Sequence, residues 1–298
     1  MINVLNEYGT VIENVSLKKY NTYKIGGIAK YLISPNDINS LKELIIYLNK
    51  ENIKYMVLGN GSNVIFSDDL YDGVIIKLDN FKNITIDNTK ITAESGVMLP
   101  NLVKVAIQKN LVGLEWASGI PGTLGGSIYG NAGAYKSETA DFIENITIMD
   151  KLGNIKILKK EDVDFSYRYS SFKDKYKECI ILNATLNLEK GNKEEALKLI
   201  HDRLERRLSS QPLEYPSAGS VFRNPEGDAA GRIIEHEIKF KGKRIGGAEV
   251  SKKHANFIIN TGSASSKDIK DLIELIHKEV LEKTNIDLII EQEFINWE

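Results

Sequence analysis

Hydrophobic residues along the chain recur with two different periods, and each period predicts a different kind of element. After Ser34-Pro35, apolar residues at positions 38, 41, 44, 45 and 48 fall on one face of a helix. Short apolar runs predict strands over residues 55–58, 64–66, 74–78, 91–94, 146–150, 155–158 and 180–188. Further helices are expected over 100–110, where a proline opens the helix, over the charged stretch from 192 to about 208, and over 266–283.

This mixture of helices and strands places the chain in the α+β class. The pattern divides it into three predicted units, residues 1–75, 76–191 and 192–298. The middle unit is mostly strands, and the third begins where the polar turn at residues 189–192 ends the last of them. The final strand of the chain is expected to pack back on the earlier units.

Composition and charge exclude several classes of function. The 298 residues carry a net charge of -2, and lysines are interleaved with acids, so we expect no nucleic-acid partner. The N-terminus lacks the basic flank and apolar stretch of a signal peptide, and no run of eighteen apolar residues occurs, so a cytoplasmic protein without membrane insertion is expected. The single cysteine, Cys179, cannot form an internal disulfide and is expected to be a buried strand residue. The four histidines are dispersed, and no metal site is predicted.

The most informative stretch runs from Trp116 to Tyr135 and reads WASGIPGTLGGSIYGNAGAY. Its six glycines remove β-carbons, allow positive φ, and leave N–H groups that can turn toward a phosphate or a flat ring. Glycine is entropically unfavourable, at up to about 1 kcal/mol relative to alanine, which favours a functional reason for so many. The alternative is a run of tight turns.

A second glycine cluster, Gly59-Asn60-Gly61-Ser62-Asn63, lies upstream. It is not a dinucleotide-binding fingerprint, because Val64 stands where a third glycine would be needed and a strand, not a helix, follows. A strand-loop-strand with small polar residues at its tip is instead suited to gripping a diphosphate through backbone N–H groups and the side chains of Ser62 and Asn63.

Together with the stretch Asn21-Thr22-Tyr23-Lys24-Ile25-Gly26-Gly27, these segments resemble the UDP-N-acetylenolpyruvoylglucosamine reductase family, flavoenzymes of bacterial cell-wall precursor synthesis. The resemblance runs from about Asn21 to Glu293, with the motifs in the family's order. It implies a vanillyl-alcohol-oxidase-type (PCMH) FAD-binding fold, with two subdomains at 1–75 and 76–191 and an α/β substrate-binding domain at 192–298. The contacts it implies for tightly bound FAD are Gly59, Asn60, Gly61, Ser62, Asn63, Ile120, Pro121, Gly122, Thr123, Gly125, Gly126, Asn131, Gly133 and Ala134.

A serine in the third unit is a candidate proton donor. Ser220 follows Ala218-Gly219 in a loop between prolines, and no Gly-x-Ser-x-Gly hydrolase motif surrounds it. Most serines in such loops only cap turns. The resemblance implies that Ser220 is the general acid of the reaction and that Asn224 binds substrate.

Arg168 is the one charge in an aromatic stretch that runs from Phe165 to Phe172. An arginine there can hold a carboxylate while the rings exclude water, although a surface cation-π contact is the alternative. The resemblance implies catalytic roles for Arg168 and Glu293, and substrate binding by Tyr167. Glu291 competes with Glu293, because strand alternation would point both to the same face.

The family's chemistry implies that NADPH reduces FAD and leaves, after which the enolpyruvyl sugar nucleotide binds and accepts the hydride. Arg168 and Glu293 would then stabilise the enolic charge while Ser220 protonates the α-carbon. The short interval between Tyr169 and Cys179 resembles the shorter form of the family, which lacks a tyrosine-bearing loop. A basic residue is common before Gln211-Pro212 in the family, whereas Ser209-Ser210 stand here, so Arg206 or Arg207 is expected to contact the substrate diphosphate.

Two other classes of function share part of this pattern. A different flavin oxidase or dehydrogenase of the same fold would need the glycine segments, but not Ser220, Asn224 and Glu293 together. A non-catalytic nucleotide-binding protein would need none of these three.

Overall fold

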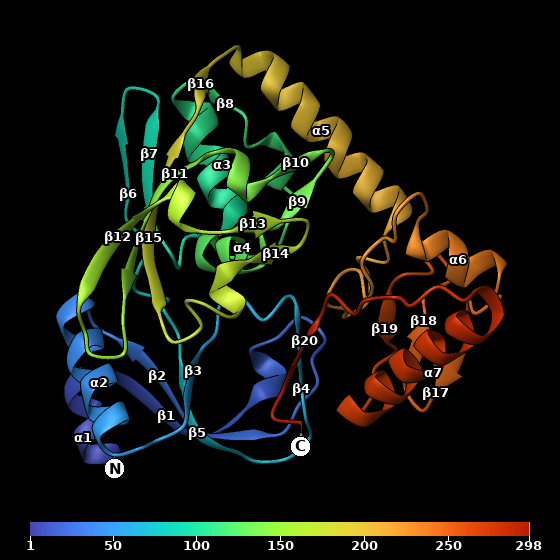
Figure 1. Cartoon of the computed structure of the whole chain (residues 1–298), viewed down its shortest axis with the longest axis horizontal. Coiled ribbons are helices and arrows are strands. Elements are labelled where there is room, and N and C mark those ends of the chain that lie inside the picture. The colour runs from blue at the N-terminus through green and yellow to red at the C-terminus, as the bar shows by residue number, and fades with distance from the viewer. Residues whose placement is uncertain (298) are drawn as a thin grey trace. The chain divides into compact units, whose positions relative to one another are not determined.

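The computed structural model describes residues 1–297, which form two compact units (Figure 1). Unit 1 comprises Met1–Glu13, Tyr31–Asn60 and Asp72–Glu205, and unit 2 comprises Asn14–Lys30, Gly61–Tyr71 and the residues from Arg206 on. The chain passes from one unit to the other within three strands, one loop and one long helix. The three domains predicted above, 1–75, 76–191 and 192–298, remain a prediction.

Seven α-helices and five short 3-10 turns are present in residues 1–297. The helices are α1 (Ile2–Tyr8), α2 (Ile38–Lys50), α3 (Leu99–Gln108), α4 (Leu124–Gly130), α5 (Lys193–Ser210), α6 (Ala230–His236) and α7 (Ser266–Thr284). The 3-10 turns are η1 (Leu17–Lys19), η2 (Glu115–Ala117), η3 (Thr139–Asp141), η4 (Lys160–Asp162) and η5 (Ser171–Lys173).

The strands belong to one five-stranded sheet and several smaller ones. The first ten are β1 (Gly9–Ser16), β2 (Ile28–Pro35), β3 (Tyr55–Val57), β4 (Val64–Phe66), β5 (Tyr71–Ile76), β6 (Ile84–Asp87), β7 (Lys90–Glu94), β8 (Leu111–Val112), β9 (Gly133–Ala134) and β10 (Ser137–Glu138). The remainder are β11 (Ile143–Met149), β12 (Ile155–Lys159), β13 (Phe165–Ser166), β14 (Tyr169–Ser170), β15 (Ile180–Asn187), β16 (Glu189–Lys190), β17 (Arg244–Ile245), β18 (Ala248–Val250), β19 (Ile258–Asn260) and β20 (Glu293–Ile295).

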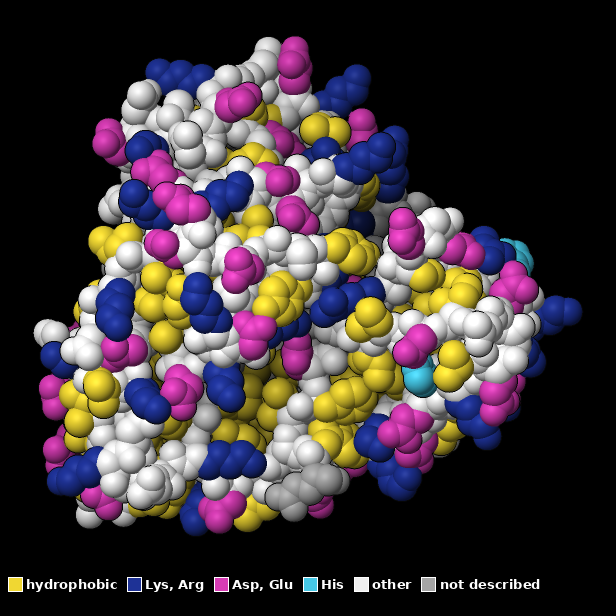
Figure 2. All heavy atoms as spheres, viewed as in Figure 1, with side chains coloured by type: hydrophobic (Ala, Val, Ile, Leu, Met, Phe, Trp, Pro, Cys, Tyr) yellow, Lys and Arg dark blue, Asp and Glu magenta, His cyan; other side chains and the backbone are white. Residues whose placement is uncertain are grey.

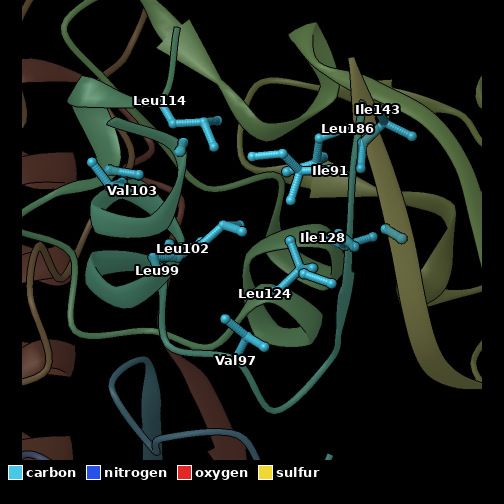
Figure 3. Close-up of a cluster of buried hydrophobic side chains, with 14 of the residues drawn as sticks. Ile91, Val97, Leu99, Leu102, Val103, Leu114, Leu124, Ile128, Ile143 and Leu186 are labelled. Atoms are coloured by element: carbon cyan, nitrogen blue, oxygen red, sulfur yellow. The ribbon is translucent and has the colours of Figure 1, made fainter. Parts of the chain in front are cut away.

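The largest sheet lies in unit 1 and has the order β12-β11-β15-β7-β6, with every neighbouring pair antiparallel. Helices α3 and α4 pack against one face of it, as the side chains drawn in Figure 3 show. The sequence produces α3 because a proline at its start and apolar residues at 99, 102, 103, 106 and 107 give it one buried stripe.

A second core in unit 1 lies beneath α2. The four buried residues of this helix, Leu41, Leu44, Ile45 and Leu48, pack with apolar residues of β2 and β5. Strands β3 and β5 are parallel, with Tyr55 opposite Val74 and Val57 opposite Ile76. Their carboxyl ends therefore reach the same edge of the β1-β2-β5-β3 sheet, where the Gly59-Asn60 turn begins.

Unit 2 is built around the antiparallel sheet β17-β18-β19, with α6 and α7 packed into the same core. A parallel pair formed by β20 and β4 belongs to the same unit, with Glu293 opposite Val64. The side-chain and backbone groups of Ser265 and Asp268 form a reciprocal cap at the start of α7. Lysine and arginine side chains are interspersed with acidic ones over the face shown in Figure 2.

Two expectations about local structure are wrong, and three short helices were missed. Cys179 is half-buried and lies one residue before β15, so it is not a buried strand residue. Helices α1, α4 and α6 were not predicted, because each has only seven residues and therefore too few positions to show a helical period. Gly125, Gly126 and Gly130 do not adopt left-handed backbone angles, since they lie within α4. The positive φ angles of that region belong instead to Asn131, Tyr135 and Lys136.

Candidate functional site

The two predicted cofactor-binding segments meet in unit 1. The side-chain amide of Asn60 donates a hydrogen bond of 2.7 Å to the Pro121 carbonyl. A β-carbon on Gly59 would lie 2.8 Å from Thr123 Oγ1, closer than two such atoms normally approach. Gly59 is therefore a glycine because Thr123 packs directly against its backbone.

Thr123 also begins the helix of the second segment. Its hydroxyl accepts a hydrogen bond of 3.3 Å from the Gly126 N–H, which satisfies one of the free donors of α4. Inside this helix the glycines differ in their surroundings. A β-carbon on Gly125 would lie 2.9 Å from Ser95 Cβ, so packing within the protein explains this glycine.

Packing does not explain Gly126 or Gly130. Gly126 is exposed, and a β-carbon there would meet only Thr123 Oγ1 at 3.4 Å, while one on Gly130 would have no atom within 4 Å. Backbone without side chains beside open space is a surface against which a flat or phosphate-bearing ligand can lie closely. The residues of this part of unit 1 therefore fit FAD, the cofactor expected from the sequence.

The remainder of the upstream loop lies in unit 2. Gly61 has a φ of 65°, and a β-carbon there would lie 2.2 Å from the Tyr20 carbonyl oxygen, so no other residue fits this turn. The side-chain amide of Asn63 donates to the Glu291 carbonyl at 3.1 Å, and the Glu293 N–H donates to the Asn63 carbonyl at 2.9 Å. The loop that the sequence groups as one motif is thus divided between the two units, with Ser62 half-buried in the second.

Arg168 is held in a strained conformation in unit 1. Its guanidinium donates a hydrogen bond of 2.6 Å to the Gly133 carbonyl and lies 5.1 Å from the centre of the Tyr167 ring. Its φ of 58° is unfavourable for a residue with a β-carbon, and such angles concentrate at functional sites. The cation-π contact expected as the alternative is present, together with a carbonyl contact that fixes the direction of the side chain.

Asn131, predicted as a cofactor contact, is fully buried and its side chain is engaged within the protein. The amide nitrogen donates to the Ser166 carbonyl at 2.9 Å, and the amide oxygen accepts from the Ala140 N–H at 3.0 Å. This side chain joins α4 to the β13–β14 hairpin that carries Arg168.

A buried glutamine organises the Ser220 loop in unit 2. Gln292 donates to the carbonyls of Ala218 at 3.0 Å and of Gly219 and Ser220 at 3.4 Å, and its amide oxygen accepts from the Tyr23 hydroxyl at 3.1 Å. Complete burial raises the pKa of Tyr23, which keeps its hydroxyl protonated as a donor. Ser220 itself is half-buried and follows Gly219, whose φ is 77°.

The two competing glutamates flank this glutamine. Gln292 is buried, whereas Glu291 and Glu293 are both half-buried, which agrees with the alternation of a strand. Backbone contacts place Glu291 beside Val221 and Glu293 beside Asn63. Asn224, the predicted substrate contact, is exposed, and its side-chain oxygen accepts a hydrogen bond of 3.1 Å from the Ala230 N–H at the start of α6.

Ser209 and Ser210 end helix α5. Both hydroxyls donate to the Arg206 carbonyl, at 2.9 and 2.6 Å, so they serve the helix end. Of the basic residues expected to replace the missing cation, Arg206 is exposed and Arg207 is half-buried. A residue that the sequence did not suggest, Lys253, also reaches this helix end and donates to the Leu208 carbonyl at 2.5 Å.

Arg168 thus lies in unit 1, while Ser220 and Glu293 lie in unit 2.

Sequence reasoning missed the buried Lys77, whose ammonium donates to the Gly59 carbonyl. The only signal for it was a lysine within the apolar run Val74-Ile75-Ile76-Lys77-Leu78. No helix within residues 1–297 has the length and apolar character needed to cross a bilayer.

Comparison with known proteins gives two family matches. Residues 29–159 match a family described as an FAD binding domain, and residues 211–295 match the C-terminal domain of UDP-N-acetylenolpyruvoylglucosamine reductase. The first match confirms the expected FAD-binding class of fold.

Individual relatives cover nearly the whole chain. A UDP-N-acetylenolpyruvoylglucosamine reductase of Caldanaerobacter subterraneus subsp. tengcongensis is 46% identical over 283 residues, 95% of this chain and 93% of that protein. One from Clostridium novyi is 43% identical over 92% of this chain and 89% of that protein. The crystal structure of the Thermus caldophilus reductase, 33% identical, superimposes with a TM-score of 0.82 over 96% of this chain and 99% of that one. A glucose dehydrogenase, Phl p 4.0202, is 12% identical with a TM-score of 0.50 over 64% of this chain and 44% of its own, and shares the fold alone.

Proposed function

The chain belongs to the UDP-N-acetylenolpyruvoylglucosamine reductase family, and from this membership we propose that it uses NADPH to reduce the enolpyruvyl group of UDP-N-acetylglucosamine enolpyruvate, giving UDP-N-acetylmuramate. It is an FAD-binding oxidoreductase of peptidoglycan precursor synthesis. The observation that carries the proposal is the meeting of the two glycine segments in unit 1, with exposed backbone at Gly126, inside a matched FAD-binding domain.

Bound FAD supplies the hydride chemistry that links NADPH to the substrate double bond. The chain would hold this cofactor with the Gly59-Asn60 turn and with Ile120, Pro121, Gly122, Thr123, Gly125 and Gly126. Gly61, Ser62 and Asn63 are proposed as further contacts. Gly133 and Ala134 complete the set of proposed contacts, with Asn131 acting through the chain segments that it joins.

Arg168 is proposed to bind the carboxylate of the enolpyruvyl group. Its contacts with the Gly133 carbonyl and the Tyr167 ring restrict the side chain before substrate arrives, so little conformational entropy remains to be lost. Addition of hydride at the β-carbon moves negative charge onto the α-carbon and the carboxylate, and a fixed guanidinium stabilises that charge. Tyr167, exposed beside it, is proposed to contact the substrate.

Ser220 is proposed to deliver a proton from its hydroxyl to the α-carbon. The Gln292 amide holds the carbonyls on either side of Gly219, which fixes the backbone from which the serine projects. Glu293 is proposed to assist by stabilising the enolic oxygen, with its backbone fixed through Asn63. A positioned general acid contributes about two to four orders of magnitude in rate.

Further side chains are proposed to bind the remainder of the substrate. Asn224 is proposed to hydrogen-bond the sugar nucleotide through its side-chain nitrogen, since its oxygen already accepts from the Ala230 N–H. Arg206 or Arg207 is proposed to contact the diphosphate, because the hydroxyls of Ser209 and Ser210 are used at the end of α5. We further propose a cytoplasmic location, where nucleotide-linked sugars and NADPH are made.

The test separates the two halves of the reaction. Purified protein containing FAD should be yellow, and NADPH should bleach it under anaerobic conditions. Addition of UDP-N-acetylglucosamine enolpyruvate should restore the colour with formation of one D-lactyl ether per flavin. If the reduced flavin were instead reoxidised rapidly by oxygen and did not respond to the enolpyruvyl substrate, the protein would be an oxidase of the same fold. That result would reject the proposal.

A further inference from the structure

Lys77 is a buried cation placed under the Gly59-Asn60 turn. We propose that it is a positioning residue for FAD: its ammonium fixes this turn in the ligand-binding conformation and places a positive charge beneath it, where the cofactor's diphosphate is held. The inference rests on the proposed function only in taking FAD as the ligand of the turn.

The sheet brings Lys77 to this place. Strands β3 and β5 are parallel, and their last paired residues are Val57 and Ile76. Gly59 follows Val57 by two residues, and Lys77 directly follows Ile76. Because carboxyl ends of parallel strands lie at the same edge, the lysine emerges beside the turn.

Burial of this ammonium has a free-energy penalty that an apolar side chain would avoid. Lys77 is 7% exposed, and desolvation lowers its pKa, while the nearby carboxylate of Asp79 acts in the opposite direction. Asp79 lies 3.6 Å away with its side chain 53% exposed, so it compensates the buried charge incompletely. A methionine could occupy the volume of the aliphatic part of Lys77 without this penalty. The presence of lysine therefore indicates that the charge has a function.

The contact with Gly59 determines how the turn presents its backbone. Lys77 Nζ donates to the Gly59 carbonyl. In a trans peptide the carbonyl and the following N–H point in opposite directions, and no cis peptide is found in residues 1–297. Holding the Gly59 oxygen toward the lysine therefore turns the Asn60 N–H to the opposite side, while the Asn60 side chain is held by Pro121.

The experiment measures FAD binding directly. Deflavinated wild type, Lys77→Met and Lys82→Met are titrated with FAD by flavin fluorescence, and their thermal unfolding is followed with and without FAD. Lys82 is the matched control, because it is an exposed lysine close enough to influence the charge of Lys77. We expect Lys77→Met to bind FAD at least tenfold more weakly, Lys82→Met to stay within twofold of wild type, and Lys77→Arg to recover part of the loss.

Equal FAD affinity in Lys77→Met and wild type would overturn the proposal, and so would an equal loss in Lys82→Met, which would show an effect of net charge alone. If Lys77→Met does not fold, Asp79→Asn decides the question. Removing this counter-charge should tighten FAD binding at least twofold, and unchanged or weaker binding would overturn the proposal. Failure of the wild type to bind FAD would instead reject the proposed function.

Discussion

Gly126 offers the sharpest test of whether the cofactor lies against α4. An alanine β-carbon at this exposed position would meet only Thr123 Oγ1 at 3.4 Å, and the backbone of Gly126 is helical. Replacing a helical glycine with alanine normally stabilises a protein by about 0.5–1 kcal/mol. If packing within the protein were the only constraint, Gly126→Ala would therefore raise the free energy of unfolding.

If FAD lies against this backbone, the same added methyl group should weaken cofactor binding. Gly126→Ala should yield an apoprotein at least as stable as wild type, yet one that binds FAD at least about tenfold more weakly, a loss of about 1.4 kcal/mol in binding free energy. The assay combines thermal unfolding of the apoprotein with FAD titration. We expect the substitution to preserve or raise the thermal stability of the apoprotein and to lower its affinity for FAD.

Gly125 and Gly130 provide the controls within the same helix. A β-carbon on Gly125 would lie 2.9 Å from Ser95 Cβ and 3.3 Å from its carbonyl oxygen, so Gly125→Ala should destabilise the apoprotein by about 1–3 kcal/mol through overpacking. A β-carbon on Gly130 would have no atom within 4 Å, so Gly130→Ala should not destabilise the apoprotein. Wild-type FAD affinity in Gly126→Ala would refute the reasoning, because the glycine would then have no ligand to accommodate.

Three further substitutions test the proposed roles of single side chains. Ser220→Ala should leave FAD content and NADPH-driven bleaching unchanged while substrate-driven reoxidation slows by at least about a hundredfold in stopped-flow absorbance; normal reoxidation would remove Ser220 from the mechanism. Arg168→Lys should raise the KM for the enolpyruvyl substrate at least about tenfold in steady-state assays, because lysine cannot hold a carboxylate bidentately; an unchanged KM would contradict carboxylate binding. Tyr23→Phe should lower the free energy of unfolding in urea by about 1–3 kcal/mol, since the buried Gln292 oxygen loses its donor; an unchanged midpoint would show that water replaces the hydroxyl.

Local periodicity was sufficient to predict the long elements. The apolar spacing between Ile38 and Leu48 predicted α2, and all four of the residues Leu41, Leu44, Ile45 and Leu48 are buried. The charged helix α5 and the long helix α7 were predicted within a few residues of their observed ends. These predictions are confirmed because a helix of three or more turns repeats its pattern often enough to be read without tertiary information.

The glycine-rich segment shows where local information fails. Three of the seven residues of α4 are glycines, so intrinsic propensity argues against a helix. The helix forms because Thr123 caps it and because Leu124 and Ile128, four residues apart, are buried against the large sheet. Tertiary burial therefore overrides propensity, and the sequence alone gave no measure of that burial.

The contacts that assemble the candidate site are separated too far along the chain for any local pattern to reveal them. Asn60 and Pro121 are 61 residues apart, Arg168 and Gly133 are 35 apart, and Asn63 and Glu291 are 228 apart. Family resemblance could supply a set of residues with roles, but not the distinction between a glycine required by a neighbour and one left open for a ligand. Gly125 and Gly126 are adjacent residues of the same type, and the closeness of Ser95 to Gly125 alone distinguishes their surroundings. Which glycine backbone is left uncovered in this segment is therefore set by residues far away in the sequence, and the motif itself does not encode it.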